Sequence, residues 1–243
     1  MEQGTVVALM NDSAMVALRA AFTQCQDMDA PLAERLDFYS RAVRSHIPDY
    51  ADAVDQLVQR LSLHNAGETA PHPGDTMPPF LMPDETGRLV SLDSLLAEGP
   101  VAVTFHRGHW CPWCRINLNA LSQAQDRISS VRGQLVAVVP ERQKFAAELK
   151  ARTKSPFPVL TDMDNGYALS LQLTIWVGPD LQRLLSSYGY DLTDYQGNDS
   201  WMLPIPATFV VAADGRIKAR FIDPDFRRRM AVDDLVDALK SAR

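Results

Sequence analysis

Two of the three cysteines in this chain, Cys111 and Cys114, stand three positions apart in the stretch FHRGHWCPWCR. The stretch begins at the end of the apolar run VAVTF, and a helix is expected from Pro112 onward. A cysteine in the first turn of a helix meets free backbone N–H groups and the positive end of the helix dipole, which favour a thiolate. At this spacing one sulfur can attack an oxidant or a disulfide and the other can resolve the product. The pair therefore predicts redox chemistry.

A metal site is the rival interpretation, because His106 and His109 lie just upstream of the cysteines. A structural zinc site usually needs four ligands, and the sequence has no second C-x-x-C or H-x-x-x-H. We also expect His106 to leave its strand on a different heading from the cysteines. These points favour redox sulfur over a metal, and an idle buried pair would not explain the spacing.

The elements that must position the cysteines alternate between strands and helices after residue 70. Short apolar runs predict buried strands, and longer amphipathic segments predict helices. The expected strands are 101–105, 134–139, one within 157–162 and a hairpin over 207–222 that turns at Asp214-Gly215, and the expected helices are 112–128, 141–153 and 232–239. This order predicts an α/β fold with a central mixed sheet flanked by helices. It also places the cysteines where a central strand turns into a helix, the edge of α/β sheets at which functional sites are commonly found.

The N-terminal part reads differently, as three helices without strands. We expect one from Ser13 to Gln24, one beginning at Pro31 and one over 53–61. The stretch HNAGETAPHPGDTMPP follows and is rich in glycine and proline, so it predicts a linker, with a boundary near residue 70. This gives a helical extension over 1–70 and a second domain over 71–243. The extension could pack on that domain or form a homodimer interface.

Composition narrows the classes of function. The 243 residues hold 24 basic and 30 acidic side chains, for a formal net charge of −6, which argues against a generic nucleic-acid or anionic-membrane binder. The first residues lack a basic segment and a cleavage site of the signal-peptide type, and no stretch is apolar for long enough to cross a bilayer. We therefore predict a cytoplasmic protein, in whose reducing surroundings a close cysteine pair is more often catalytic than structural.

The chain resembles the peroxiredoxin-like branch of the alkyl hydroperoxide reductase / thiol-specific antioxidant (AhpC/TSA) family, within the thioredoxin superfamily. The resemblance covers about residues 70–243. It is carried by PGDTMPPFLMPDETGRLVSLDSLL, VAVTFHRGHWCPWCRINLNAL, FPVLTD, GNDSWMLPIPATFVVAADGRI and FIDPDFRRR. It implies a thioredoxin-like fold and reduction of peroxides or disulfides by cysteine, with no metal or organic cofactor.

The family pattern P-x-x-x-T-x-x-C is not preserved in either register. With Cys114 as the attacking cysteine, Arg107 takes the place of the proline and Cys111 that of the threonine. With Cys111 as the attacking cysteine, those places fall on Thr104 and Gly108. A loop that reads R-A-T-F in peroxiredoxins here reads PATF and begins at Pro206. The chain therefore combines peroxiredoxin and thioredoxin features.

Three residues are predicted to support the pair. In thioredoxin-like folds a cis proline faces the cysteines, and Pro206 is expected to fill that role, whereas Pro204 reads as an ordinary loop proline. Arg107 is expected to lower a cysteine pKa and to bind a peroxide oxygen, with a solvated arginine as the open alternative. Trp110 is expected to shield the sulfur and to offer a partner an apolar surface.

The neighbouring side chains are given plainer expectations. For Trp113, plain packing is as strong an interpretation as the shielding role that is expected of Trp110. His109 is expected to be solvated, Arg115 to lie on the surface, and Cys25 to be a half-buried inert thiol. The basic cluster DPDFRRRM near the C-terminus is expected to form a solvated face or a local ion-pair site.

Three mechanisms stay open at this stage. In the preferred one, a thiolate of the pair attacks a peroxide, a sulfenic acid forms, and the other thiol condenses with it to a disulfide that a thioredoxin- or glutathione-type donor reduces. In the second, Cys111 attacks a protein or small-molecule disulfide. In the third, the pair is a non-enzymatic redox sensor.

Overall fold

The structure is a computed structural model that describes residues 2–242, with side chains from Ser13 onward. It opens with three helices, α1 (Glu2–Asp27), α2 (Leu32–His46) and α3 (Pro48–Leu63). Pro31 caps α2 and Pro48 occupies the first turn of α3, as their fixed φ favours. The prediction that a helix begins at Ser13 is wrong, because no proline interrupts the chain before it and α1 already begins at Glu2.

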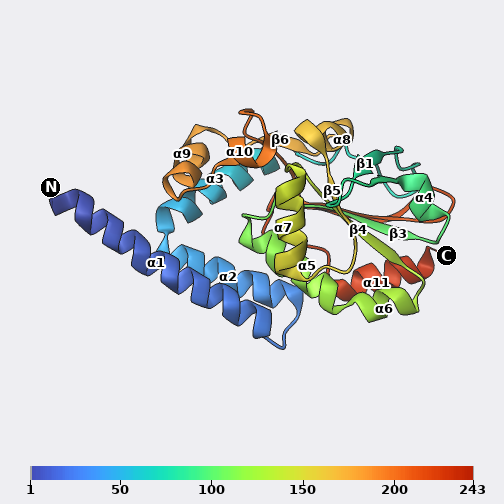
Figure 1. Cartoon of the computed structure of the whole chain (residues 1–243), viewed down its shortest axis with the longest axis horizontal. Coiled ribbons are helices and arrows are strands. Elements are labelled where there is room, and N and C mark those ends of the chain that lie inside the picture. Colours follow the sequence, from blue (N-terminus) through green and yellow to red (C-terminus); the bar gives the residue numbers. More distant parts are fainter. Residues whose placement is uncertain (1, 243) are drawn as a thin grey trace.

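A five-stranded mixed sheet forms the centre of the fold (Figure 1). Its strand order is β5-β4-β3-β8-β9, and the parallel strands β3, β4 and β5 are joined at β3 to the antiparallel strands β8 and β9. The strands are β3 (Val101–Phe105), β4 (Gln134–Val139), β5 (Val159–Thr161), β8 (Ala207–Val211) and β9 (Ile217–Ile222). Every residue of β3 is buried, since it is the middle strand and has cover on both faces.

Side chains of β3 alternate between two cores. Val101, Val103 and Phe105 point to a core closed by α8 (Gly166–Ser170) and the segment before β3, whereas Ala102 points to a core closed by helices on the other face. The helices of that second face are α5 (Pro112–Gln123), α6 (Gln125–Ser130), α7 (Gln143–Thr153) and α11 (Val232–Ser241). The single helix predicted over 112–128 is therefore two helices, which meet at Ala124.

The remaining elements are short and were not predicted. They are β1 (Leu81–Pro83), β2 (Leu89–Ser91), α4 (Leu92–Leu96), the 3₁₀ turn η1 (Met163–Asn165), β6 (Thr174–Trp176), α9 (Pro179–Ser187), α10 (Leu192–Gln196) and β7 (Met202–Pro204). β6 and β7 pair as a two-stranded ribbon, and α9 packs against α3.

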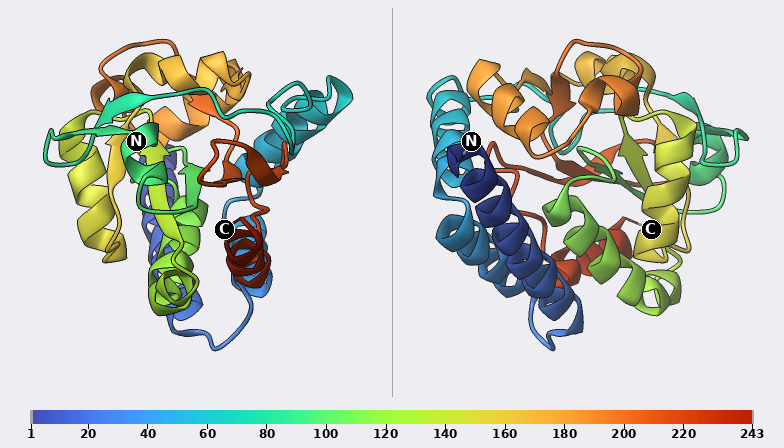
Figure 2. Two further views of the ribbon diagram at one scale, coloured as in Figure 1. Left: turned by 90° about the vertical axis from the view of Figure 1, so that its right-hand side faces the viewer. Right: turned by 60° about the vertical axis from the view of Figure 1, so that its left-hand side comes forward.

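The N-terminal helices lie against the cysteine motif. α1 and α2 pack on each other and on α5, and the right-hand view of Figure 2 shows the two helices side by side along one side of the molecule. One apolar core runs through α1, α2 and α3, the start of α5 and the segment 177–203. The cysteine motif is therefore covered both by the N-terminal helices and by the segment 177–203. Within residues 2–242, none of the helices is both long and apolar enough to span a lipid bilayer.

Candidate active site

The two cysteines lie where β3 passes into α5, as predicted. Cys111 caps the N-terminus of α5 and Cys114 lies in its first turn, behind Pro112 at the first helical position. Both thiols are free and almost fully buried, with exposed fractions of 1% for Cys111 and 0% for Cys114. Two thiols held together beside a helix N-terminus are arranged for sulfur chemistry rather than for surface exposure.

Donors converge on the sulfur of Cys114. The backbone N–H of Arg107 donates to its Sγ at 3.3 Å, and the Nη2 of Arg229 donates at 3.6 Å. Burial raises the pKa of Cys114. Hydrogen bonding from Cys111 and His106 and the positive charge of Arg229 outweigh that effect, so the pKa lies well below its ordinary value. Of the two cysteines, Cys114 is therefore the one whose ionised form these neighbours favour.

Cys111 has the opposite tendency. Burial raises its pKa well above the ordinary value, and the negative sulfur of Cys114 raises it further, although Arg107 and Arg229 oppose the change. Ionisation of one buried thiol opposes ionisation of the other when the two are in contact. The hydrogen bond with Cys114 also favours the protonated form of Cys111.

His106 lies beside Cys114, so the prediction that it points elsewhere is wrong. Its backbone N–H donates to the carbonyl of Val138 at 2.9 Å, which extends the β3 ladder by one residue. Since Phe105 faces one core, the alternation of the strand puts Thr104 and His106 on the other face, where α5 lies. Burial lowers the pKa of His106, which favours the neutral ring, and its Nε2 lies 3.1 Å from the Thr104 hydroxyl.

Arg107 is buried rather than solvated. Only 2% of the residue is exposed, because its guanidinium lies 3.9 Å from the centre of the Phe226 ring and 5.0 Å from that of Trp110. Its Nη1 and Nη2 atoms have no hydrogen-bond partner among the described residues. A buried cation without an anion is costly. The positive charge of Arg107 favours the ionised form of the nearby Cys111 and so opposes the rise in its pKa.

Both tryptophans of the motif are packed inside the fold. Trp113 donates from Nε1 to the Ser40 hydroxyl at 2.9 Å and meets Tyr39 edge-on, with ring centres 5.1 Å apart. Trp110 packs against Tyr190, with ring centres 5.5 Å apart. The tryptophans therefore fasten the cysteine motif to α2 on one side and to the segment before α10 on the other.

His109 is also buried, which corrects the expectation of a solvated ring. Its Nδ1 lies 2.7 Å from one carboxylate oxygen of Glu141, and its backbone N–H donates to the other oxygen at 2.7 Å. Burial raises the pKa of Glu141, although the contacts with His109 oppose this. The carboxylate lies against Gly108. The φ angle of Gly108 is +135°, a backbone conformation that glycine adopts readily and other residues rarely do. This pairing fixes the loop that delivers the cysteines.

The Ile205–Pro206 peptide bond is trans, so the predicted cis proline is wrong. No cis bond occurs within residues 2–242. The chain reaches Pro206 from the β6–β7 ribbon already extended, since the Ile205 N–H donates to the Leu173 carbonyl at 2.7 Å, and it continues straight into β8. A trans bond is the lower-energy state for such a segment.

Arg229 is the site residue that sequence reasoning missed. Its neighbours form the local ion pairs that were predicted, Arg227 with Asp225 and Arg228 with Asp223, and Arg227 pairs in addition with the distant Asp55 of α3. Arg229 instead reaches Cys114, which is 115 residues away in the sequence. No local pattern distinguishes it from the two arginines before it.

Two further expectations are settled by burial. Cys25 is fully buried and donates to the Arg35 carbonyl at 3.3 Å, and burial raises its pKa to about 11, which makes it an inert thiol. Arg115 is half-buried rather than on the surface, with its guanidinium 4.3 Å from the centre of the Phe22 ring. Among the described residues, no group of three or more His, Cys, Asp and Glu side chains is arranged to hold a metal ion.

Comparison with known proteins agrees with this fold. The solved structure of peroxidoxin BcpB from Mycobacterium tuberculosis matches with a TM-score of 0.55 at 20% identity, over 70% of this chain and 97% of that one. The C45S mutant of peroxiredoxin 6 from Arenicola marina matches with a TM-score of 0.53 at 16% identity, over 70% of this chain and 73% of that one. At these identities the likeness concerns the fold alone.

Sequence relatives point the same way. Peroxiredoxin Q of Sedum lineare chloroplasts is 27% identical over 92 residues, which are 38% of this chain and 49% of that protein. A Mycobacterium tuberculosis protein with a peroxiredoxin name is 27% identical over 89 residues, 37% of this chain and 58% of that protein. The chain thus spans about half to three fifths of the curated relatives it matches. Residues 73–220 match the sequence pattern of the AhpC/TSA family, and this chain belongs to that family.

Proposed function

We propose that this chain is a thiol peroxidase in which the Cys114 thiolate attacks a hydroperoxide and Cys111 resolves the product as a Cys111–Cys114 disulfide. The observation that carries the proposal is the convergence of the Arg107 N–H and the Arg229 guanidinium on the sulfur of Cys114. A thiolate is the reactive form of cysteine, and Cys114 is the cysteine whose pKa is lowered. Cys111 takes the place of the family's threonine and supplies a thiol where that residue has a hydroxyl.

The first step oxidises Cys114. Its sulfur attacks the terminal oxygen of the hydroperoxide, an S–O bond forms, the O–O bond breaks, and Cys114 becomes a sulfenic acid. The alkoxide or hydroxide that leaves takes the proton of the Cys111 thiol and departs as an alcohol or as water. Cys111 is then the thiolate.

The second step closes the disulfide. The Cys111 thiolate attacks the sulfur of the sulfenic acid, and hydroxide leaves and takes a proton from solvent to form water. After the first step the negative charge lies on Cys111 instead of Cys114. Arg229 lies beside Cys114, and the charges of both Arg107 and Arg229 favour the Cys111 thiolate. An external thiol donor of the thioredoxin or glutathione type then reduces the disulfide.

A dithiol–disulfide oxidoreductase with Cys111 as the nucleophile is the second candidate. The C-x-x-C spacing at the start of α5 favours it, since Cys111 precedes the helix and Cys114 follows within its first turn. The raised pKa and the burial of Cys111 count against it, because a protein disulfide would have to displace the cover formed by the N-terminal helices. We therefore rank peroxide first.

Single cysteine-to-serine variants test the assignment, made in a Cys25→Ser background so that only the pair can react. After a brief exposure to hydrogen peroxide, dimedone should label Cys114 in the Cys111→Ser variant and nothing in the Cys114→Ser variant. Labelling of Cys111 alone would reverse the roles. A failure of both variants to form a sulfenic acid, with the wild type still reducing a small disulfide, would select the second candidate.

We infer three further properties that these experiments do not address. The extension over residues 1–70 and the domain over 71–243 form the two parts of the chain. The protein works in the cytoplasm, where reducing conditions return the pair to thiols. A homodimer can form through the exposed side of the extension, and sedimentation of the purified protein measures this directly.

A further inference from the structure

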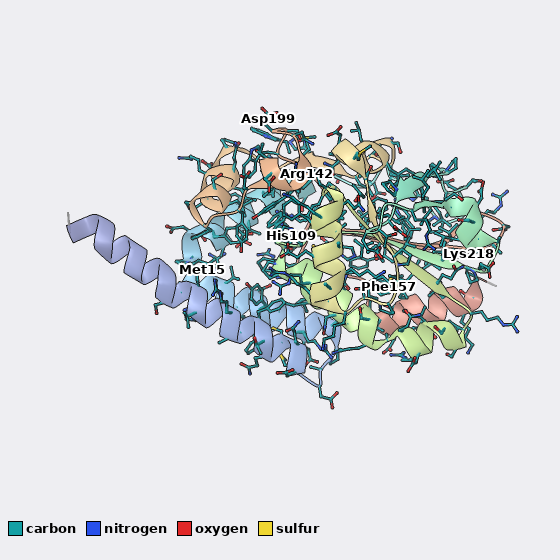
Figure 3. All side chains as sticks on the ribbon, viewed as in Figure 1. Met15, His109, Arg142, Phe157, Asp199 and Lys218 are labelled. Carbon is teal, nitrogen blue, oxygen red and sulfur yellow. The ribbon has the colours of Figure 1, made fainter. Side chains whose placement is uncertain are left out.

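A small pocket of about 30 Å³ lies beside the cysteine motif and has room for a water molecule. Trp110 and Trp113, which flank Cys111 in the sequence, line it on the side of the motif. The pocket adjoins a wider cleft, whose lining includes Met15 of α1 and His109 of the motif, both labelled in Figure 3. The side chains that close this pocket therefore belong to the cover around the resolving cysteine.

Tyrosine rings form much of the remaining wall of this pocket. Tyr39 of α2 and Tyr188 and Tyr190, which follow α9, also line the wider cleft. Tyr50 of α3 lines the small pocket from a buried position, 6% exposed, and its ring meets that of Tyr188 edge-on with ring centres 6.1 Å apart. Among the side chains of residues 13–242, none is hydrogen-bonded to the Tyr50 hydroxyl, so this O–H is free to donate.

The hydroxyl of Tyr50 shares its charged neighbours with Cys111. Burial raises the pKa of Tyr50, the positive charge of Arg107 opposes that rise, and a negative charge on Cys111 adds to it. The same Arg107 is the larger of the two cations that favour the Cys111 thiolate. The Tyr50 phenol therefore stays protonated at neutral pH, and it lies in the field of the cation and the sulfur that take part in the second step.

Other titratable and charged groups face Cys111 as well. They are Cys114, Arg107, Arg229, Arg115, Tyr39 and Tyr190. Tyr39 and Tyr190 differ from Tyr50 in lining the wider cleft, where solvent water can bind their hydroxyls. Tyr50 is thus the tyrosine of this group whose hydroxyl faces the pocket beside the motif without also facing the cleft.

We propose that Tyr50 is a positioning residue for the second step, whose hydroxyl acts together with Arg107 to stabilise the Cys111 thiolate. The inference rests on the proposed peroxidase function and gives the N-terminal helices a part in it. In the second step the negative charge stays on Cys111 until its sulfur attacks the sulfenic acid of Cys114 and hydroxide leaves. A neutral O–H near this sulfur stabilises the charge without adding one, and hydrogen bonds to charged groups are stronger than those between neutral groups.

The first test titrates Cys111 as the single cysteine of the chain, in a Cys25→Ser, Cys114→Ser background. The chemical shift of its Cβ, measured by NMR on protein labelled with carbon-13 cysteine, distinguishes thiol from thiolate. At a given pH below the midpoint, Tyr50→Phe should reduce the thiolate fraction about tenfold, as expected for one hydrogen bond to a charged group. Tyr167→Phe is the matched control and should titrate as the background does, because Tyr167 packs in the core around Phe105 and donates to the Pro78 carbonyl.

The second test follows the reaction in a Cys25→Ser background that keeps the pair. After oxidation by hydrogen peroxide, dimedone should trap the sulfenic acid of Cys114 for about tenfold longer in Tyr50→Phe than in Tyr167→Phe. An unchanged titration of Cys111 in Tyr50→Phe, an unchanged lifetime of the sulfenic acid, or a larger change in Tyr190→Phe would overturn the role of Tyr50. A shifted titration in a protein that forms no sulfenic acid would sustain the effect of Tyr50 on Cys111 and overturn the peroxidase instead.

Discussion

The Nη2 atom of Arg229 lies 3.6 Å from the Sγ of Cys114, across a sequence separation of 115 residues. Arg229 belongs to the loop before α11 and Cys114 to the first turn of α5, so only the folded chain brings the cation to the sulfur. The loop that reads R-A-T-F in peroxiredoxins begins with Pro206 in this chain and so carries no arginine at that position. In this chain the guanidinium comes from a different loop.

Removing this guanidinium should raise the pKa of Cys114. The thiolate is lost as the pH falls through the pKa of the folded protein, so a higher pKa moves that loss to higher pH. In Arg229→Met, alkylation of Cys114 by iodoacetamide at pH 7 should slow about tenfold, as expected for the loss of a nearby opposite charge. Arg228→Met is the control, since Arg228 is exposed and pairs with Asp223. Equal pH profiles for both variants would remove Arg229 from the site.

Replacing Arg107 should slow the second step of the reaction. Without Arg107, the larger of the two charges that favour the Cys111 thiolate is lost and only that of Arg229 is left. The sulfenic acid on Cys114 should therefore persist about tenfold longer in Arg107→Met, as judged by dimedone trapping over time. Because Nη1 and Nη2 are buried without partners, the variant should be at least as resistant to urea as the wild type. Rapid disulfide formation combined with a loss of stability would instead make Arg107 a packing residue.

Gly108 should not tolerate a side chain. A Cβ at this position would lie 2.4 Å from Oε1 of Glu141, and that carboxylate cannot retreat without losing its two contacts with His109. Gly189 also has positive φ but open space around it, so Gly189→Ala isolates the backbone strain, about 1–2 kcal/mol. In urea unfolding, Gly108→Ala should cost about 1–3 kcal/mol more than this control. Equal costs would mean that the Glu141 contact does not constrain the loop.

Opening the cover over the pair should expose its thiols. Tyr39 packs edge-on against Trp113, and truncating a buried aromatic side chain costs about 3–5 kcal/mol of packing. In a Cys25→Ser background, Tyr39→Ala should therefore react at least about tenfold faster with a bulky aromatic disulfide. Val16→Ala, on the exposed side of α1, serves as the control because Val16 is 65% exposed. Unchanged reactivity in Tyr39→Ala would show that the N-terminal helices do not limit access.

Much of the fold was predictable because continuous apolar runs mark buried strands. The bounds predicted for β3 and β4 are those observed, and the cysteine pair was correctly placed at the helix start that follows β3. Short elements between residues 163 and 204 were missed, since helices and strands of three to nine residues depend on packing that no local pattern reveals.

The surroundings of the cysteines were harder to predict than the cysteines themselves. His106 was assigned to the wrong side, although counting alternate positions from Phe105 along β3 would have placed it toward α5. Arg107 and His109 have polar side chains that suggest solvent, yet aromatic rings and Glu141 enclose them. Arg229 was missed because its contact with Cys114 joins residues 115 positions apart. No local pattern in a single sequence signals such a contact.

The most direct test of the account is stopped-flow oxidation of the reduced wild-type protein by hydrogen peroxide, followed through the fluorescence of Trp110 and Trp113 beside the pair. The account predicts a rate far above that of free cysteine, with the reaction ending at one Cys111–Cys114 disulfide per chain by mass spectrometry. A rate no faster than that of free cysteine, or an end product without that disulfide, would contradict it.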